Sequence, residues 1–91
     1  MKNKISITLS EHQMEVILKQ VSPYILDERI ENEFSSVIFQ DEIYSISLTS
    51  DELEELIGGV SFIANQEKRK DKVYELYLLL DHLESYLAIY R

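Results

Sequence analysis

The stretch that decides the fold is residues 43–53, which read IYSISLTSDEL. From Tyr44 to Leu48 the apolar side chains alternate with serines, which predicts a strand with one buried face. Thr49 and Glu52 then stand at the spacing of a capping box, and acidic side chains suit the positive end of a helix. The stretch therefore predicts a half-buried strand that passes directly into a helix.

Two helices are predicted downstream of this stretch. The first should bury a stripe made of Leu53, Leu56, Ile57, Val60 and Ala64. We expect it to end near Asn65, which would be its C-terminal cap residue. A charged connection, residues 67–70, then leads into a last helix from about Asp71 to Tyr90. The two helices should pack as an antiparallel pair.

The pair Gly58-Gly59 lies inside the first stripe, although glycine in a helix costs about 1 kcal/mol per residue relative to alanine. The pair does not stand between a strand and a helix start, so it matches no phosphate-binding loop. We interpret it as a place where another helix approaches the bare backbone. A bend or break in the helix and a functional hinge are the alternatives.

The N-terminal part of the chain repeats the strand-to-helix pattern. Ile5 to Leu9 alternates apolar and hydroxyl residues, and Ser10 and Gln13 again have capping-box spacing. The helix that follows should bury the stripe Met14, Ile17, Leu18 and Val21. A duplicated unit would account for this repeated pattern. We favour the simpler interpretation that any strand followed by a capped amphipathic helix requires the same types of residue.

Pro23 interrupts this first helix, because proline lacks a backbone donor and disfavours a helical residue before it. A second helix can start at Pro23, with Ser22 as its cap, and run to about Glu33. The alternative is one continuous helix with a kink. The sequence leaves both arrangements open.

A hairpin is predicted next. Residues 36–40 and 43–48 are rich in β-branched and aromatic side chains, and the polar link Asp41-Glu42 joins them. The link holds no glycine, so the turn type is not predicted. The whole chain, residues 1–91, then reads as a single α+β domain of order β-α-(α)-β-β-α-α. We expect two layers, with a three-stranded, largely antiparallel sheet packed by three or four helices.

The composition restricts the compartment and the partners. The net charge is −8, and the absence of cysteine excludes disulfides and thiolate zinc sites. No continuous apolar run has the length of a signal peptide or a membrane span, so we expect a cytoplasmic protein without a membrane partner. The negative charge repels phosphate backbones, so we do not expect nucleic acid as a partner.

No catalytic, metal or cofactor site is predicted. The two histidines, His12 and His82, lie far apart in the sequence, and the carboxylates occupy predicted polar faces. The basic residues between Lys68 and Lys72 flank a helix end, where they offset the helix dipole. We therefore expect a protein that is not an enzyme and that needs no cofactor.

The last helix is apolar over more of its circumference than one buried stripe requires. One seam repeats every seven residues, at Val73, Leu80 and Leu87 and at Leu76, Leu83 and Tyr90. Six further apolar or aromatic residues lie outside this seam: Tyr74, Tyr77, Leu78, Leu79, Tyr86 and Ile89. A small domain can cover few of them, and exposed apolar patches usually mark interfaces. We therefore predict that these six residues bind a second copy, as a homodimer, or another protein. A helix buried centrally in one subunit is the alternative.

Two further functions are considered beside this non-catalytic interaction module. The acidic residues Asp27, Glu28, Glu31 and Glu33 suit an inhibitor or immunity-type protein that binds a basic protein partner. A small enzyme or ligand-binding protein would need a deep pocket with convergent polar groups, such as His82 and the tyrosines. It is the least favoured of the three functions.

Overall fold

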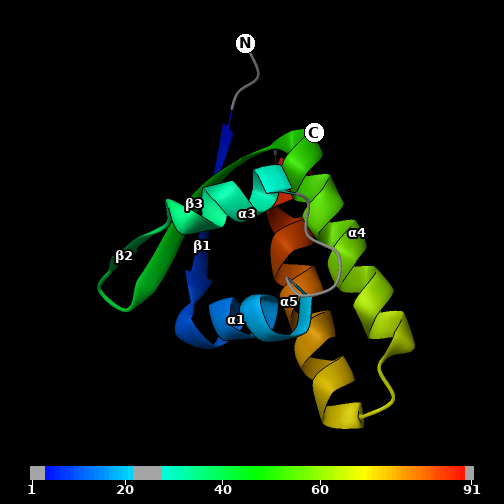
Figure 1. Cartoon of the computed structure of the whole chain (residues 1–91). Coiled ribbons are helices and arrows are strands. Elements are labelled where there is room, and N and C mark those ends of the chain that lie inside the picture. The colour runs from blue at the N-terminus through cyan, green and yellow to red at the C-terminus, as the bar shows by residue number, and fades with distance from the viewer. Residues whose placement is uncertain (1–3, 22–27, 90–91) are drawn as a thin grey trace.

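A computed structural model of the chain describes residues 4–21 and 28–89. In chain order the elements are β1 (Lys4–Ser10), α1 (Glu11–Val16), the π-helix η1 (Ile17–Val21), α3 (Glu28–Ser35), β2 (Ile38–Gln40), β3 (Ile43–Thr49), α4 (Ser50–Gln66) and α5 (Lys70–Ile89). This order and the three-stranded antiparallel sheet confirm the predicted α+β class. Figure 1 shows α4 and α5 side by side as an antiparallel pair to the right of the strands.

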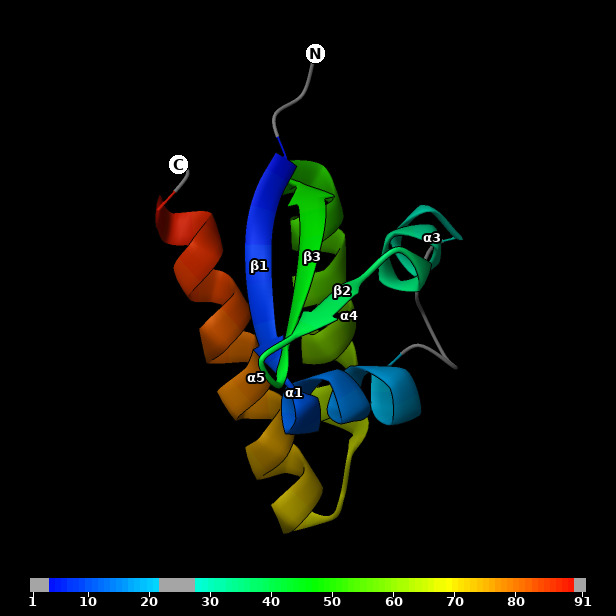
Figure 2. The same cartoon turned by 90° about the vertical axis from the view of Figure 1, so that its left-hand side faces the viewer.

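The sheet has the strand order β1-β3-β2, and both neighbouring pairs are antiparallel. The partners on its inner face are Ile5 with Leu48, Ile7 with Ile46, and Leu9 with Tyr44. Serines and threonines of both strands occupy the other face, which is turned toward the viewer in Figure 2, with α4 behind it. The predicted alternation in β1 and β3 is therefore confirmed, and the core lies between the sheet and the helices.

Both predicted capping boxes are present, and their geometry is the same. Ser10 Oγ accepts the Gln13 N–H at 3.1 Å, and Gln13 Oε1 accepts the Ser10 N–H at 2.8 Å. The corresponding distances between Thr49 and Glu52 are 3.1 and 2.8 Å. Because β1 and β3 run antiparallel, the two capped helices leave the sheet at opposite ends.

The helix after β1 differs from its prediction at Leu18, whose side chain is 51% exposed. The α-helix changes at Ile17 into the π-helix η1. Val16 and Val21, five residues apart, are both buried, as the wider repeat of a π-helix allows. This wider turn moves Leu18 out of the buried stripe.

The structure describes a further helix of this region, α3, and the choice between one kinked helix and two separate helices falls on residues 22–27, outside the described part of the chain. The helix α3 starts at Glu28 and extends two residues beyond the predicted end at Glu33. The predicted start, with Ser22 as cap and Pro23 at the first position, lies outside the described residues.

The link between β2 and β3 is a two-residue turn in which Asp41 and Glu42 have φ values of 54° and 64°. Two consecutive residues in the left-handed region define a type I′ turn, whose twist matches that of the strands. Glycine and asparagine usually supply this conformation, and their absence hid the turn type from the sequence. β2 itself begins at Ile38, two residues later than predicted.

Glu42→Gly should raise the free energy of unfolding by up to about 1 kcal/mol. The left-handed conformation costs a residue with a Cβ about 1–2 kcal/mol, and the greater freedom of glycine in the unfolded chain offsets part of the gain. Urea unfolding followed by circular dichroism measures the change. Gln40→Gly, within β2, is the control and should be destabilising; a loss of stability in both variants would contradict the turn assignment.

The helix α4 runs without a break through Gly58 and ends at Gln66. Gly58 is exposed, and a Cβ built on it would meet no atom within 4 Å, its own chain neighbours and helix backbone aside, in the described part of the chain. The interpretation of Gly58 as a site of close helix approach is therefore wrong, and the helix is not broken there. Asn65 is also not the cap, because the C-cap is Glu67, whose N–H donates to the Ile63 carbonyl at 3.0 Å.

Candidate interaction surface

The helix α5 has one side in the core and another on the surface. Its buried residues are Leu76, Leu79, Leu83 and Leu87. On the other side, Tyr74 is 66% exposed, Tyr77 is 46% exposed and Leu78 is 51% exposed. Tyr77 and Leu78 follow Tyr74 by three and four positions, so all three side chains are neighbours on one turn of the helix. Ile89, 74% exposed, lies apart from them at the C-terminal end of α5.

The other two residues predicted for this surface lie elsewhere. Leu79 is only 1% exposed and belongs to the core, so its assignment to an exposed interface is wrong. The sequence placed Leu80 in the buried seam, but Leu80 is only partly buried. The helix is thus rotated from the predicted seam toward Leu79. Tyr86 is also partly buried, against the first strand of the sheet.

Tyr86 and His82 of α5 bind the backbone of β1 at Thr8. The Thr8 N–H donates to Tyr86 Oη at 3.2 Å, and the two hydroxyl oxygens are 2.9 Å apart. His82 Nε2 lies 2.7 Å from the Thr8 carbonyl oxygen, so this nitrogen must carry the hydrogen. The two rings meet edge to face at 5.3 Å. Since β1 is an edge strand, these side chains occupy groups that a foreign strand would use.

Tyr86→Phe should lower the free energy of unfolding by about 1 kcal/mol, because the N–H and hydroxyl of Thr8 lose their shared partner. Chemical denaturation measures the difference. Ser6→Ala is the control, since Ser6 is exposed two residues away on the same strand β1 and also loses one hydroxyl. Equal losses in the two variants would show that the contact with Thr8 contributes nothing specific.

The hairpin carries exposed apolar side chains on both faces: Ile38 and Ile43 lie on the outer face, and Phe39, opposite Tyr44, lies on the inner one. These residues were not predicted as a surface. Ile38 is 63% exposed, Phe39 52% and Ile43 44%. The Phe39 ring packs on the Tyr44 ring with 4.4 Å between centroids. The two-residue turn pairs Gln40 with Ile43, which places Ile38 and Ile43 together on the outer face of the sheet. The two-residue link Asp41-Glu42 was predicted, and this placement of Ile38 and Ile43 follows from its length.

The carboxylates of the predicted acidic surface differ in their surroundings. Glu28 and Glu31 are exposed on α3, whereas Glu33 accepts a hydrogen bond from Lys4 Nζ at 2.8 Å. That hydrogen bond raises the pKa of Lys4 above its usual value. Asp27 lies outside the described residues. The carboxylates of this segment are therefore not one uniform acidic patch.

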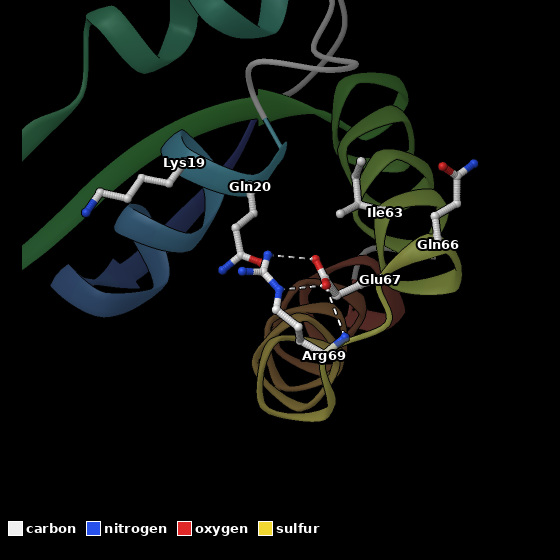
Figure 3. Close-up of a pocket in the computed structure, with 6 residues that line it drawn as sticks. All are labelled: Lys19, Gln20, Ile63, Gln66, Glu67 and Arg69. Carbon is white, nitrogen blue, oxygen red and sulfur yellow. Dashed lines mark hydrogen bonds and ion pairs between the residues drawn. The ribbon is translucent and has the colours of Figure 1, made fainter.

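A small hollow of about 230 Å³ beside the α4–α5 connection is lined by two basic residues, Arg69 of the connection and Lys19 of η1. Figure 3 shows the Arg69 guanidinium turned toward the Glu67 carboxylate, with an Nε–Oε1 distance of 2.9 Å. The hydrogen bonds from the Arg69 side chain and backbone lower the pKa of Glu67 to about 2. Lys19 is likewise 2.7 Å from Glu15. An anion entering this hollow would meet carboxylates beside each of these cations, so it is not an attractive anion site.

Three further features bear on function: the metal-ligating side chains, an open groove and the length of the helices. Within residues 4–21 and 28–89, no group of three or more His, Asp or Glu side chains could hold a metal ion. The distance from His12 Nε2 to Glu75 Oε1 is 3.5 Å, and His12 lies far from His82 in the sequence.

An open groove of about 960 Å³ runs between α4 and α5. Its lining residues are Glu54, Ile57, Gly58, Ser61, Glu84, Ser85, Leu87 and Ala88. Among the described helices, none has the length and apolarity needed to cross a membrane.

Comparison with known proteins gives no relative. No family model, no curated protein and no solved structure matches this chain. Function must therefore be inferred from the surfaces themselves, and the exposed side of α5 is the one on which apolar side chains cluster along a long helix.

Proposed function

We propose that the protein is a non-catalytic interaction module whose copies associate through the exposed side of α5. The observation that carries this proposal is the cluster of Tyr74, Tyr77 and Leu78, each about half or more exposed on one helical turn. Tyrosine suits an interface, because its ring is buried well while its hydroxyl finds a polar partner. The opposite side of α5 already fills the core, so the cluster is not needed for folding.

A second copy is the partner that the charges of α5 favour. Within α5, Lys70 and Lys72 lie in the first turn beside Asp71, and Asp81 and Glu84 lie in the C-terminal half. A helix that carries both signs can complement a reversed copy of itself. At 20 residues, α5 is also about 30 Å long, which is enough for an extended helix–helix contact.

Tyr77→Asp should raise the dissociation constant of the dimer at least about tenfold, because it places a carboxylate in the apolar centre of the surface. Sedimentation velocity over a dilution series measures the constant. Phe62→Asp is the matched control, since Phe62 is 51% exposed on the neighbouring helix α4. Equal weakening by both variants would contradict the proposed location, and a monomeric natural chain at every concentration would contradict self-association.

Binding of a basic protein partner is the second candidate, favoured by the exposure of Glu28 and Glu31 on α3 in a chain of net charge −8. Affinity capture at low and high salt should then recover a basic protein only at low salt. A Glu28→Gln/Glu31→Gln variant should lose that protein, whereas Tyr77→Asp should retain it. Capture that is unaffected by salt or by the double variant would contradict this candidate.

A further inference from the structure

Resting on the proposed self-association, we infer that two α5 helices pair antiparallel about Tyr77, so that Lys70 of each copy faces Glu84 of the other. This gives the interface an orientation and a register. It also assigns an attractive role to two charged side chains of a strongly acidic protein.

The helix α5 carries a second seam outside the core. Its members are Lys70, Tyr74, Tyr77, Asp81, Glu84 and Ala88, and all six are exposed. They follow one another at alternating steps of four and three residues, which is the spacing of the positions that face a partner in a coiled coil. The four buried leucines of α5 belong to a different line along the helix. The second seam is therefore available to another helix.

Charge selects the orientation of the pair. In a parallel two-fold pair, each seam residue lies beside its own copy, so lysine would meet lysine, and both Asp81 and Glu84 would meet like charges. Such contacts are unfavourable. In an antiparallel pair, the basic end of one helix lies against the acidic half of the other, and the two helix dipoles oppose each other favourably.

Charge also selects the register. When the two-fold axis passes at Tyr77, residues at equal distances on either side of it meet, and Lys70 and Glu84 are both seven residues away. Tyr74 then lies close to Asp81 of the other copy, where its hydroxyl can donate to the carboxylate. A register centred between Tyr77 and Asp81 would instead set Lys70 against Ala88 and leave the lysine without an opposite charge.

The experiment uses Lys70→Glu, Glu84→Lys and the double variant, with dissociation constants from sedimentation velocity. Each single reversal turns two attractive pairs per dimer into two repulsive ones, so each should weaken association about tenfold. The double variant restores opposite charges and should return to within about threefold of the natural chain. Both side chains are exposed, and each reversal places a charge that suits its end of the helix, so folding is preserved.

The Glu84→Lys variant is the most informative. It makes the net charge of −8 less negative, so general repulsion between acidic chains would fall and association would strengthen. Weakening therefore requires that Glu84 faces a positive charge. Lys68→Glu and Glu31→Lys are charge-matched controls off the seam, and neither should reproduce these effects.

Two results would overturn the inference, and they differ. A natural chain that dimerises but is not weakened by Glu84→Lys, or is not rescued by the double variant, refutes the register while self-association stands. A natural chain that stays monomeric at every concentration refutes both the register and the proposed function.

Discussion

The buried seam of α5 is the contact on which the rest of the structure depends. Leu76, Leu79, Leu83 and Leu87 pack against α4 and the inner face of the sheet, and this packing fixes the rotation of the helix about its axis. The rotation has two consequences on other sides of the helix. It brings His82 and Tyr86 to the backbone of Thr8, and it leaves Tyr74, Tyr77 and Leu78 on the surface.

These two consequences together limit how copies of the protein can associate. An edge strand with free backbone groups is a common route to uncontrolled pairing, and side chains of α5 occupy the groups of Thr8 on β1. The exposed side of α5 carries apolar side chains between charges of opposite sign. In a chain of net charge −8, close approach of two copies is favourable only where such local complementarity outweighs the general repulsion.

Much of the fold could be predicted because its signals are local. Each strand-to-helix junction is encoded by a few adjacent residues, and the capping boxes at Ser10 and Thr49 form as their spacing indicates. The turn at Asp41-Glu42 was not predictable, since tertiary pairing imposes a conformation that these residues disfavour. The candidate site was predictable only in part. Leu78, Leu79 and Leu80 are identical in type, so only packing decides that Leu79 is buried and Leu78 exposed. The exposure of Ile38 follows from the hairpin register, which the predicted two-residue link implies, although Ile38 was not predicted to be exposed.

If copies of the protein associate through α5, the rings of Tyr74 and Tyr77 are exposed in one subunit and covered in the associated protein. The most direct test is the relaxation of their ring protons by a soluble paramagnetic agent, recorded by NMR at low and high protein concentration. We expect the relaxation effect on both tyrosine rings to fall as the protein is concentrated, while the effect on the Phe62 ring stays constant. Rings that remain equally accessible at every concentration would contradict association through α5.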